Sequence, residues 1–210
     1  MGKNSILIPL IGINTSLSAV SSGLTAVFLH YMLHRNQRDR YSTTVLCNGF
    51  LAGLVSITAG CNEIEPFAAV IIGVLGGFTY FGGAKLLIRI KVDDPLEASP
   101  IHVGCGVLGL VSVGFFSTDN GIFYSGGGRL LGVQVLAIVC IFFWVLGNTI
   151  VFLVILKKMN LLRENAKTEI MGIDNMVLGG SPYNYDNTTI KALQLLKTAE
   201  EAGVIQRVVP

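Results

Sequence analysis

Long apolar stretches alternate with short polar segments over most of the chain, and the chain turns polar after Lys157. Roughly 20 consecutive apolar residues suffice for a helix to cross a bilayer. The pattern predicts five transmembrane helices, at about residues 6–33, 42–62, 66–87, 98–118 and 130–157. Residues 1–157 are therefore expected to form the membrane region, and residues 158–210 a tail outside it.

Composition supports an all-α polytopic membrane protein. Of the 210 residues, 51% are hydrophobic and only 13% are charged, whereas about a quarter of the residues in a soluble domain are charged. The net charge is only +2, and no nucleic-acid partner is expected. The lipid bilayer is the first partner that the sequence predicts.

Basic residues gather in every second connection between the predicted spans. Lys and Arg favour cytoplasmic loops, so this alternation predicts an external amino terminus and a cytoplasmic tail. The basic residues concerned are Arg35, Arg38, Arg40, Lys85, Arg89, Lys91, Lys157, Lys158 and Arg163. Within the tail, residues 189–202 have the apolar spacing of a short amphipathic helix.

The segment before the fourth span carries a helix-start pattern. Asp94 is expected to be the N-cap, Pro95 the first helical residue and Glu97 the partner that reaches back in a capping box. His102 follows the cap by eight residues, which is roughly 12 Å along a helix. An ionisable side chain at that depth is a functional-site candidate. A neutral histidine hydrogen-bonded to a neighbouring helix remains the alternative.

Small residues inside the spans indicate close packing of helices. Gly49 and Gly53 are four residues apart, as are Gly73 and Gly77, and small residues let helix backbones approach closely in a bilayer. The four cysteines all fall within the predicted spans without the spacing of metal ligands, which favours a role as small packing residues. They are Cys47, Cys61, Cys105 and Cys140.

The sequence does not indicate an enzyme. It shows neither a nucleophile with its base nor a metal-ligand cluster, and a solvated turn accounts for Glu63 and Glu65. No cofactor and no metal are expected.

Several stretches resemble the ammonium transporter family, the Amt branch of the Amt/Rh superfamily. They are NGFLAGLVSITAGC (48–61), EPFAAVIIG (65–73), VDDPLE (92–97), IHVGCG (101–106), GID (172–174) and GGSPY (179–183). The Asp-Asp-Pro sequence followed by an intramembrane histidine is the most specific of these features. The resemblance covers about residues 14–183 and corresponds to the C-terminal part of the family fold.

The resemblance implies ammonium or ammonia transport through a narrow hydrophobic pore. Family members are trimers in which ammonium loses its proton outside and passes a pair of histidines in mid-membrane. His102 aligns with the second histidine of that pair, and Thr58 and Asn48 align with polar positions near the pathway. Asp94 aligns with the motif aspartate, which we interpret as a helix cap. A plasma-membrane location is expected.

The chain also departs from the family pattern. Family members have eleven spans built around two inverted repeats, whereas five are predicted here. The first six helices and the partner histidine have no counterpart, and His30 at the cytoplasmic end of the first span cannot replace that histidine. The first hypothesis is a subunit that forms part of an ammonium channel beside a complementary half. The alternative is a truncated, non-transporting subunit that interacts with or modulates a full-length ammonium transporter.

Overall fold

The computed structural model describes residues 4–35 and 40–163, and every regular element in these ranges is helical. The predicted all-α fold is therefore confirmed. The elements are α1 (Asn4–Leu33), α2 (Thr43–Ile57), α3 (Pro66–Arg89), the π-helical turn η1 (Pro100–Gly104), α4 (Cys105–Phe116), the short 3-10 helix η2 (Ile122–Tyr124) and α5 (Arg129–Lys158). The predicted tail helix at 189–202 lies outside the described residues.

Three of the described helices are long and apolar enough to cross a membrane: Leu7–Leu33, Pro66–Arg89 and Arg129–Lys158. The helical segments Thr43–Ile57 and Pro100–Phe116 are apolar but shorter. With 15 residues, α2 is about 22 Å long, less than the roughly 30 Å of a bilayer core. The predicted helix over 42–62 is thus too long, because residues 58–63 form turns. Five membrane crossings stay a prediction.

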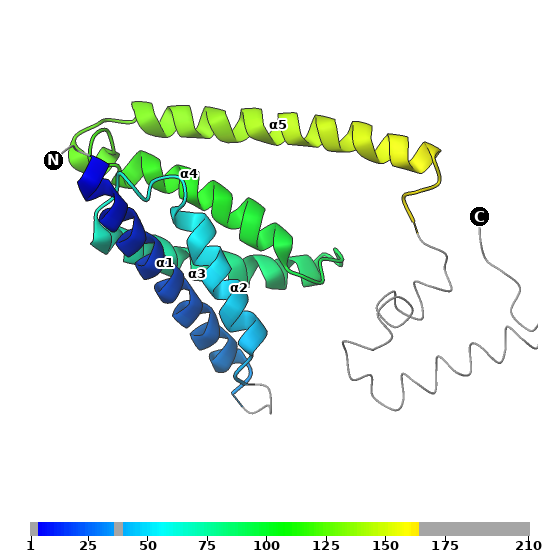
Figure 1. Ribbon diagram of the computed structural model, residues 1–210. Helices are drawn as coiled ribbons and strands as arrows, with labels where there is room; N and C mark the ends of the chain where they lie inside the picture. Colours follow the sequence, from blue (N-terminus) through cyan, green and yellow to red (C-terminus); the bar gives the residue numbers. More distant parts are fainter. Residues whose placement is uncertain (1–3, 36–39, 164–210) are drawn as a thin grey trace, which may run out of the picture. The chain divides into compact units, whose positions relative to one another are not determined.

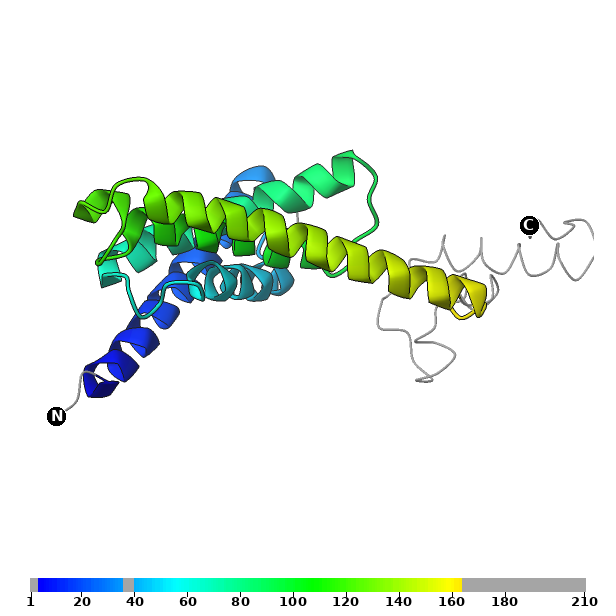
Figure 2. The same cartoon turned by 90° about the horizontal axis from the view of Figure 1, so that it is seen from above.

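The chain divides into two compact units, residues 1–144 and 145–210. In the first unit α1 packs along both α2 and α3, and these two helices in turn contact η1 and α4 (Figures 1 and 2). In the second unit the described residues, 145–163, include the C-terminal part of α5. Along its whole length α5 has no buried residue.

Glycines allow α1 to approach both of its neighbours closely. A Cβ atom added at Gly53 would lie 2.3 Å from the Ser18 carbonyl oxygen. One added at Gly73 would lie 2.0 Å from Ser21 Oγ and 2.3 Å from the same carbonyl. No larger residue fits at either position without moving a helix. The predicted close packing through these glycines is confirmed.

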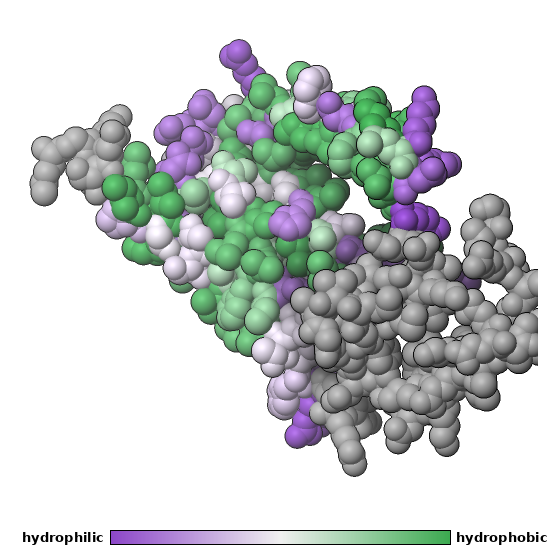
Figure 3. Space-filling model, turned by 45° about the vertical axis from the view of Figure 1, so that its right-hand side comes forward, coloured by the Kyte–Doolittle hydropathy of each residue, from purple (hydrophilic) through white to green (hydrophobic). Residues whose placement is uncertain are grey.

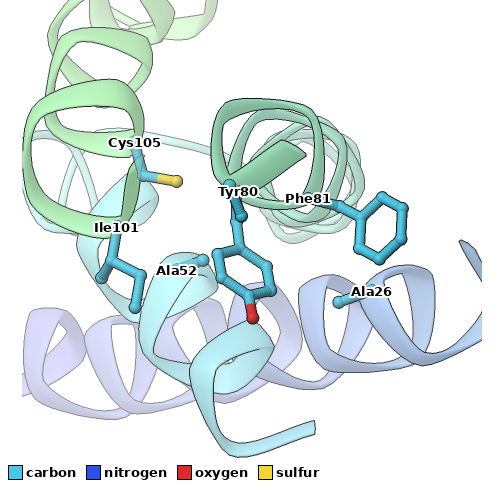
Figure 4. Packing of buried hydrophobic residues seen from close by; sticks show 7 residues of the cluster. Ala26, Ala52, Tyr80, Phe81, Ile101 and Cys105 are labelled. Carbon is cyan, nitrogen blue, oxygen red and sulfur yellow. The ribbon is translucent and has the colours of Figure 1, made fainter. Parts of the chain in front are cut away.

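The core lies between α1, α2, α3 and η1–α4. One cluster contains Tyr80, whose ring lies near Ala52 in Figure 4, and Ile101 and Cys105 join it from η1 and α4. A second cluster surrounds Ile64 in the connection between α2 and α3. The packing prediction therefore holds for Cys105, which is fully buried, but is wrong for Cys47 and Cys140, which are exposed. Both lie on helix faces that no described element covers.

The outer surface is strongly apolar. Hydrophobic residues cover much of the face seen in Figure 3, and large side chains such as Phe28, Phe78 and Trp144 are more than half exposed. A soluble monomer rarely exposes such continuous apolar area. The surface therefore fits contact with lipid or with other transmembrane helices.

Asn14 joins α1 to the connection between α2 and α3. The side chain is fully buried, and its Nδ2 donates to the carbonyl oxygens of Cys61 at 2.9 Å and Ile64 at 2.7 Å. Interhelical hydrogen bonds in membranes contribute about 0.6 kcal/mol on average and about 1.7 at most. We expect Asn14→Leu to lower the free energy of unfolding by about 1–3 kcal/mol, measured by equilibrium unfolding in detergent.

Asn62→Leu is the matched control, because Asn62 is exposed in the same connection. An equal loss of stability in the two variants would show that the two hydrogen bonds of Asn14 contribute nothing.

Candidate functional site

His102 lies on the uncovered face of η1. Its neighbours Pro100 and Ile101 are buried, as is Cys105 one turn further on, whereas His102 and Val103 are exposed. The helix therefore packs one face against α2 and α3 and turns the imidazole away from the described core. Single π-helical turns occur frequently at functional sites because they reorient the side chains that follow.

Ser99, not Asp94, directly precedes η1, so the predicted N-cap position is wrong. The Asp94 side chain nevertheless caps the backbone at the start of the helical segment. Its Oδ1 accepts a hydrogen bond from the Ala98 N–H at 3.0 Å, and its Oδ2 accepts one from the Ser99 N–H at 2.8 Å. The carboxylate thus satisfies two backbone donors that the start of a helix leaves unpaired.

The other two assignments in this motif are wrong. Pro95 lies in a turn, and the proline at the start of the helical segment is Pro100. Glu97 has a φ of +54°, a left-handed backbone conformation that interrupts any helix continuing from Pro95. Its side chain does not reach back to Asp94 but points to other helices.

Glu97 connects two helices through its carboxylate. Its Oε2 accepts hydrogen bonds from Asn48 Nδ2 on α2, at 3.0 Å, and from the Tyr80 hydroxyl on α3. Asn48 was among the residues predicted from the sequence, whereas Tyr80 was not. Tyr80 could have been identified from the sequence as a tyrosine inside an apolar helix, because a buried phenol hydroxyl usually needs a hydrogen-bond partner.

Thr58 lies apart from this network. It follows the last residue of α2, is exposed, and donates from Oγ1 to the Val55 carbonyl oxygen at 2.8 Å. Ten residues separate Asn48 from Thr58, which is about 15 Å along a helix. Asn48 is in the N-terminal half of α2 and Thr58 directly follows its last residue, so a pathway that touched both would have to run along this helix.

Glu63 and Glu65 bind the connection between α4 and α5. The Glu63 carbonyl oxygen accepts from the Thr118 N–H at 2.9 Å, and Tyr124 donates from its hydroxyl to Glu65 Oε2 at 2.9 Å. These bonds hold two loops together, so the glutamates have a structural role beyond that of a solvated turn. Within 4–35 and 40–163, no three His, Cys, Asp or Glu side chains gather in a way that could hold a metal ion.

His30 lies at the last turn of α1 and is buried. Its ring stacks on that of His34, with centroids 4.2 Å apart, and meets the Phe81 ring edge-on at 6.4 Å. The aromatic contacts hold the ring between α1 and α3. This position agrees with the interpretation that His30 is not a partner for His102.

Acidification provides a test of the Asp94 cap. The hydrogen bond from the Ser99 backbone N–H, helped by the one from Ala98, lowers the pKa of the Asp94 carboxyl below its ordinary value. The carboxylate therefore stabilises the fold above the unfolded-state pKa of about 3.9, and this contribution is lost as the pH falls through the lower folded-state value. Over this pH range, we expect the melting temperature of the wild type to fall further than the melting temperature of Asp94→Asn.

Asn has one uncharged acceptor oxygen, so the variant keeps at most one of the two hydrogen bonds and loses the titration. The measurement is thermal unfolding of both proteins in detergent between about pH 6 and pH 2, spanning the ordinary aspartate range. A wild-type–variant difference in melting temperature that stays constant throughout would contradict the cap.

The long apolar helices and the hydrophobic outer surface define an α-helical integral membrane protein, with one histidine presented on the free face of a π-helical turn. Residues 3–183 match the sequence profile of the Ammonium Transporter Family, and the chain belongs to this family. The resemblance noted from the sequence motifs is thereby confirmed.

Individual relatives agree with this assignment. Ammonium transporter 1 member 1 of Arabidopsis thaliana is 36% identical over 199 residues, which cover 87% of this chain and 39% of the relative. The crystal structure of Saccharomyces cerevisiae Mep2 superposes with a TM-score of 0.70 at 26% identity, over 77% of this chain and 38% of that chain. A solved Sensor Amt Protein gives a TM-score of 0.69 at 29% identity. The chain spans about two fifths of the length of these relatives.

Proposed function

We propose that this chain contributes to ammonium or ammonia passage across a membrane, as part of an Amt-type channel whose hydrophobic pore is lined by His102. The observation that carries the proposal is the placement of His102. It is an ionisable side chain within an apolar helical segment, on the face that the described helices leave uncovered. Membership of the ammonium transporter family supplies the substrate class.

The chemistry favours ammonia over its ion inside such a pore. An ammonium ion without its hydration shell has a large desolvation cost in an apolar conduit. Neutral ammonia avoids most of this cost if the ammonium ion passes its proton to a protein group. An imidazole can accept or donate a proton near neutral pH, which suits His102 to this step. Thr58 and Asn48 are assigned to the pathway with it, as polar positions just after α2 and in its N-terminal half.

Additional helices are needed to cover the face of η1 that carries His102. A polar imidazole facing lipid is unfavourable, and ionisable residues inside membranes almost always face a protein interior or a water-filled cavity. We assign the covering role to helices equivalent to the part of the relatives' length that this chain does not span. By family resemblance, the assembled protein is a trimer in the plasma membrane with a cytoplasmic tail.

Co-expression tests this function. In cells that lack ammonium uptake, the chain is produced alone and together with the N-terminal helices of the Arabidopsis thaliana relative. We expect uptake of labelled ammonium only in the pair, with the N-terminal helices alone as the control. Co-purification of the two chains without uptake would contradict the proposal.

The second candidate is a non-transporting subunit that modulates a full-length ammonium transporter. The observation that favours it is α5, which has 30 residues and no buried side chain, so that much surface is open for association with other helices. The test is co-purification with a full-length relative, followed by uptake at fixed levels of that relative. A changed uptake rate supports modulation, and an unchanged rate in a formed complex contradicts it.

A further inference from the structure

Three polar side chains from three separate segments meet around one carboxylate oxygen. Asn48 lies on α2, Tyr80 on α3 and Glu97 in the turn before η1. Tyr80 is only 1% exposed, and its neighbours are mainly apolar. The network thus fixes Glu97 to two helices on its inner side.

Glu97 is also bonded to η1 through its backbone. Its carbonyl oxygen accepts the N–H of Ile101 at 3.4 Å, and Ile101 directly precedes His102. The packing of α3 reinforces this connection, because a Cβ added at Gly83 would lie 2.7 Å from Pro100 Cβ. Tyr80 and Gly83 are three residues apart and share one face of α3. The helix therefore holds the turn and the start of η1 together.

The backbone of Glu97 requires such an anchor. Its φ of +54° lies in a region that non-glycine residues adopt infrequently. Such conformations persist where the surrounding structure determines them, and they cluster at functional sites. Two backbone hydrogen bonds, with Asp94 and Ile101, hold this residue within the chain, and the two hydrogen bonds to its carboxylate connect it to α2 and α3. If position 97 served only to form a turn, glycine would adopt the positive φ with less strain than glutamate.

We propose that the Asn48–Glu97–Tyr80 network is a positioning device that sets the orientation of the His102 imidazole. Glu97 acts through the backbone of η1 and not on the transported molecule. The consequence for transport rests on the proposed function, whereas the effect on the imidazole does not.

Three substitutions distinguish the contribution of the Glu97 carboxylate from that of the backbone conformation of the turn. Glu97→Gln keeps an acceptor oxygen, Glu97→Gly eases the positive φ but removes the side chain, and Tyr80→Phe removes one hydrogen bond while keeping the ring.

The test is solid-state NMR of the full chain in lipid bilayers with isotope-labelled histidine. The chain has only three histidines, and the His102 signal is identified by its loss in His102→Leu. We expect Glu97→Gly to shift or split the His102 signal while the His30 and His34 signals stay in place. Tyr80→Phe should give a smaller shift in the same direction, and Glu97→Gln should remain close to the wild type.

Leu96→Ala is the matched control, because Leu96 is 74% exposed in the same turn and should leave the His102 signal unchanged. A wild-type His102 signal in both Glu97→Gly and Tyr80→Phe would overturn the proposal. If Glu97→Gly fails to fold, Tyr80→Phe alone decides. A shifted His102 signal in this variant then supports the proposal, and a wild-type signal overturns it. A shifted signal in a chain that supports no uptake in the co-expressed pair would refute the proposed function and leave the positioning role standing.

Discussion

Ammonium uptake by the co-expressed pair falls by about 100-fold or more when His102 is replaced with leucine, because general acid–base groups typically contribute that much. Leucine is apolar and similar in size to histidine, so it fills the position on η1 without its proton-binding nitrogens. Ammonium would then have to enter the apolar path as an ion, at a large desolvation cost. The measurement is the initial rate of labelled ammonium uptake at equal protein levels.

His34→Leu is the control, since it makes the same chemical change at the end of α1, away from η1. We expect it to retain near-wild-type uptake. Equal rates for wild type and His102→Leu would remove His102 from the mechanism, and equal losses in both variants would indicate a general effect on folding.

Gly73→Val is expected to prevent stable packing of α1 against α3. The added Cβ would lie 2.3 Å from the Ser18 carbonyl oxygen, which belongs to the α1 backbone, so rotation of a side chain cannot relieve the overlap. Overpacking typically costs about 1–3 kcal/mol and occasionally more, and a clash with backbone belongs at the upper end of this range. The expected result is a large loss of monodisperse protein in detergent and a lower melting temperature.

Gly82→Val is the matched control on the same helix. A Cβ at Gly82 would have no neighbouring atom within 4 Å, so this variant should behave like the wild type. If Gly73→Val were as stable as Gly82→Val, the close approach of α1 and α3 would be wrong.

The helical ranges could be predicted because charged residues interrupt the apolar pattern where most helices end. The end of α2 shows the limit of this reasoning. The residues after Ile57 include Ala59, Gly60 and Cys61, which are apolar in composition but form turns. Hydrophobicity therefore continues through a place where the helix stops. The hydrogen bonds from Asn14, about 50 positions earlier in the sequence, hold this connection to α1, and no local pattern reveals them.

The candidate site was predictable in its chemistry but not in its geometry. His102 could be selected because it is the ionisable residue within an otherwise apolar stretch. The π-helical turn that presents it and the positive φ of Glu97 depend on contacts with α2 and α3. Asp94, Pro95 and Glu97 fit a local capping pattern, yet the carboxylate of Glu97 binds Tyr80 instead. The non-local hydrogen bonds determined the conformation here.

The orientation of His102 in the assembled protein is the central claim, and a structure of the co-expressed pair in lipid nanodiscs measures it directly. The account predicts that the imidazole faces an enclosed, narrow apolar channel between the two chains. An imidazole in contact with lipid acyl chains, with the two chains assembled, would contradict it.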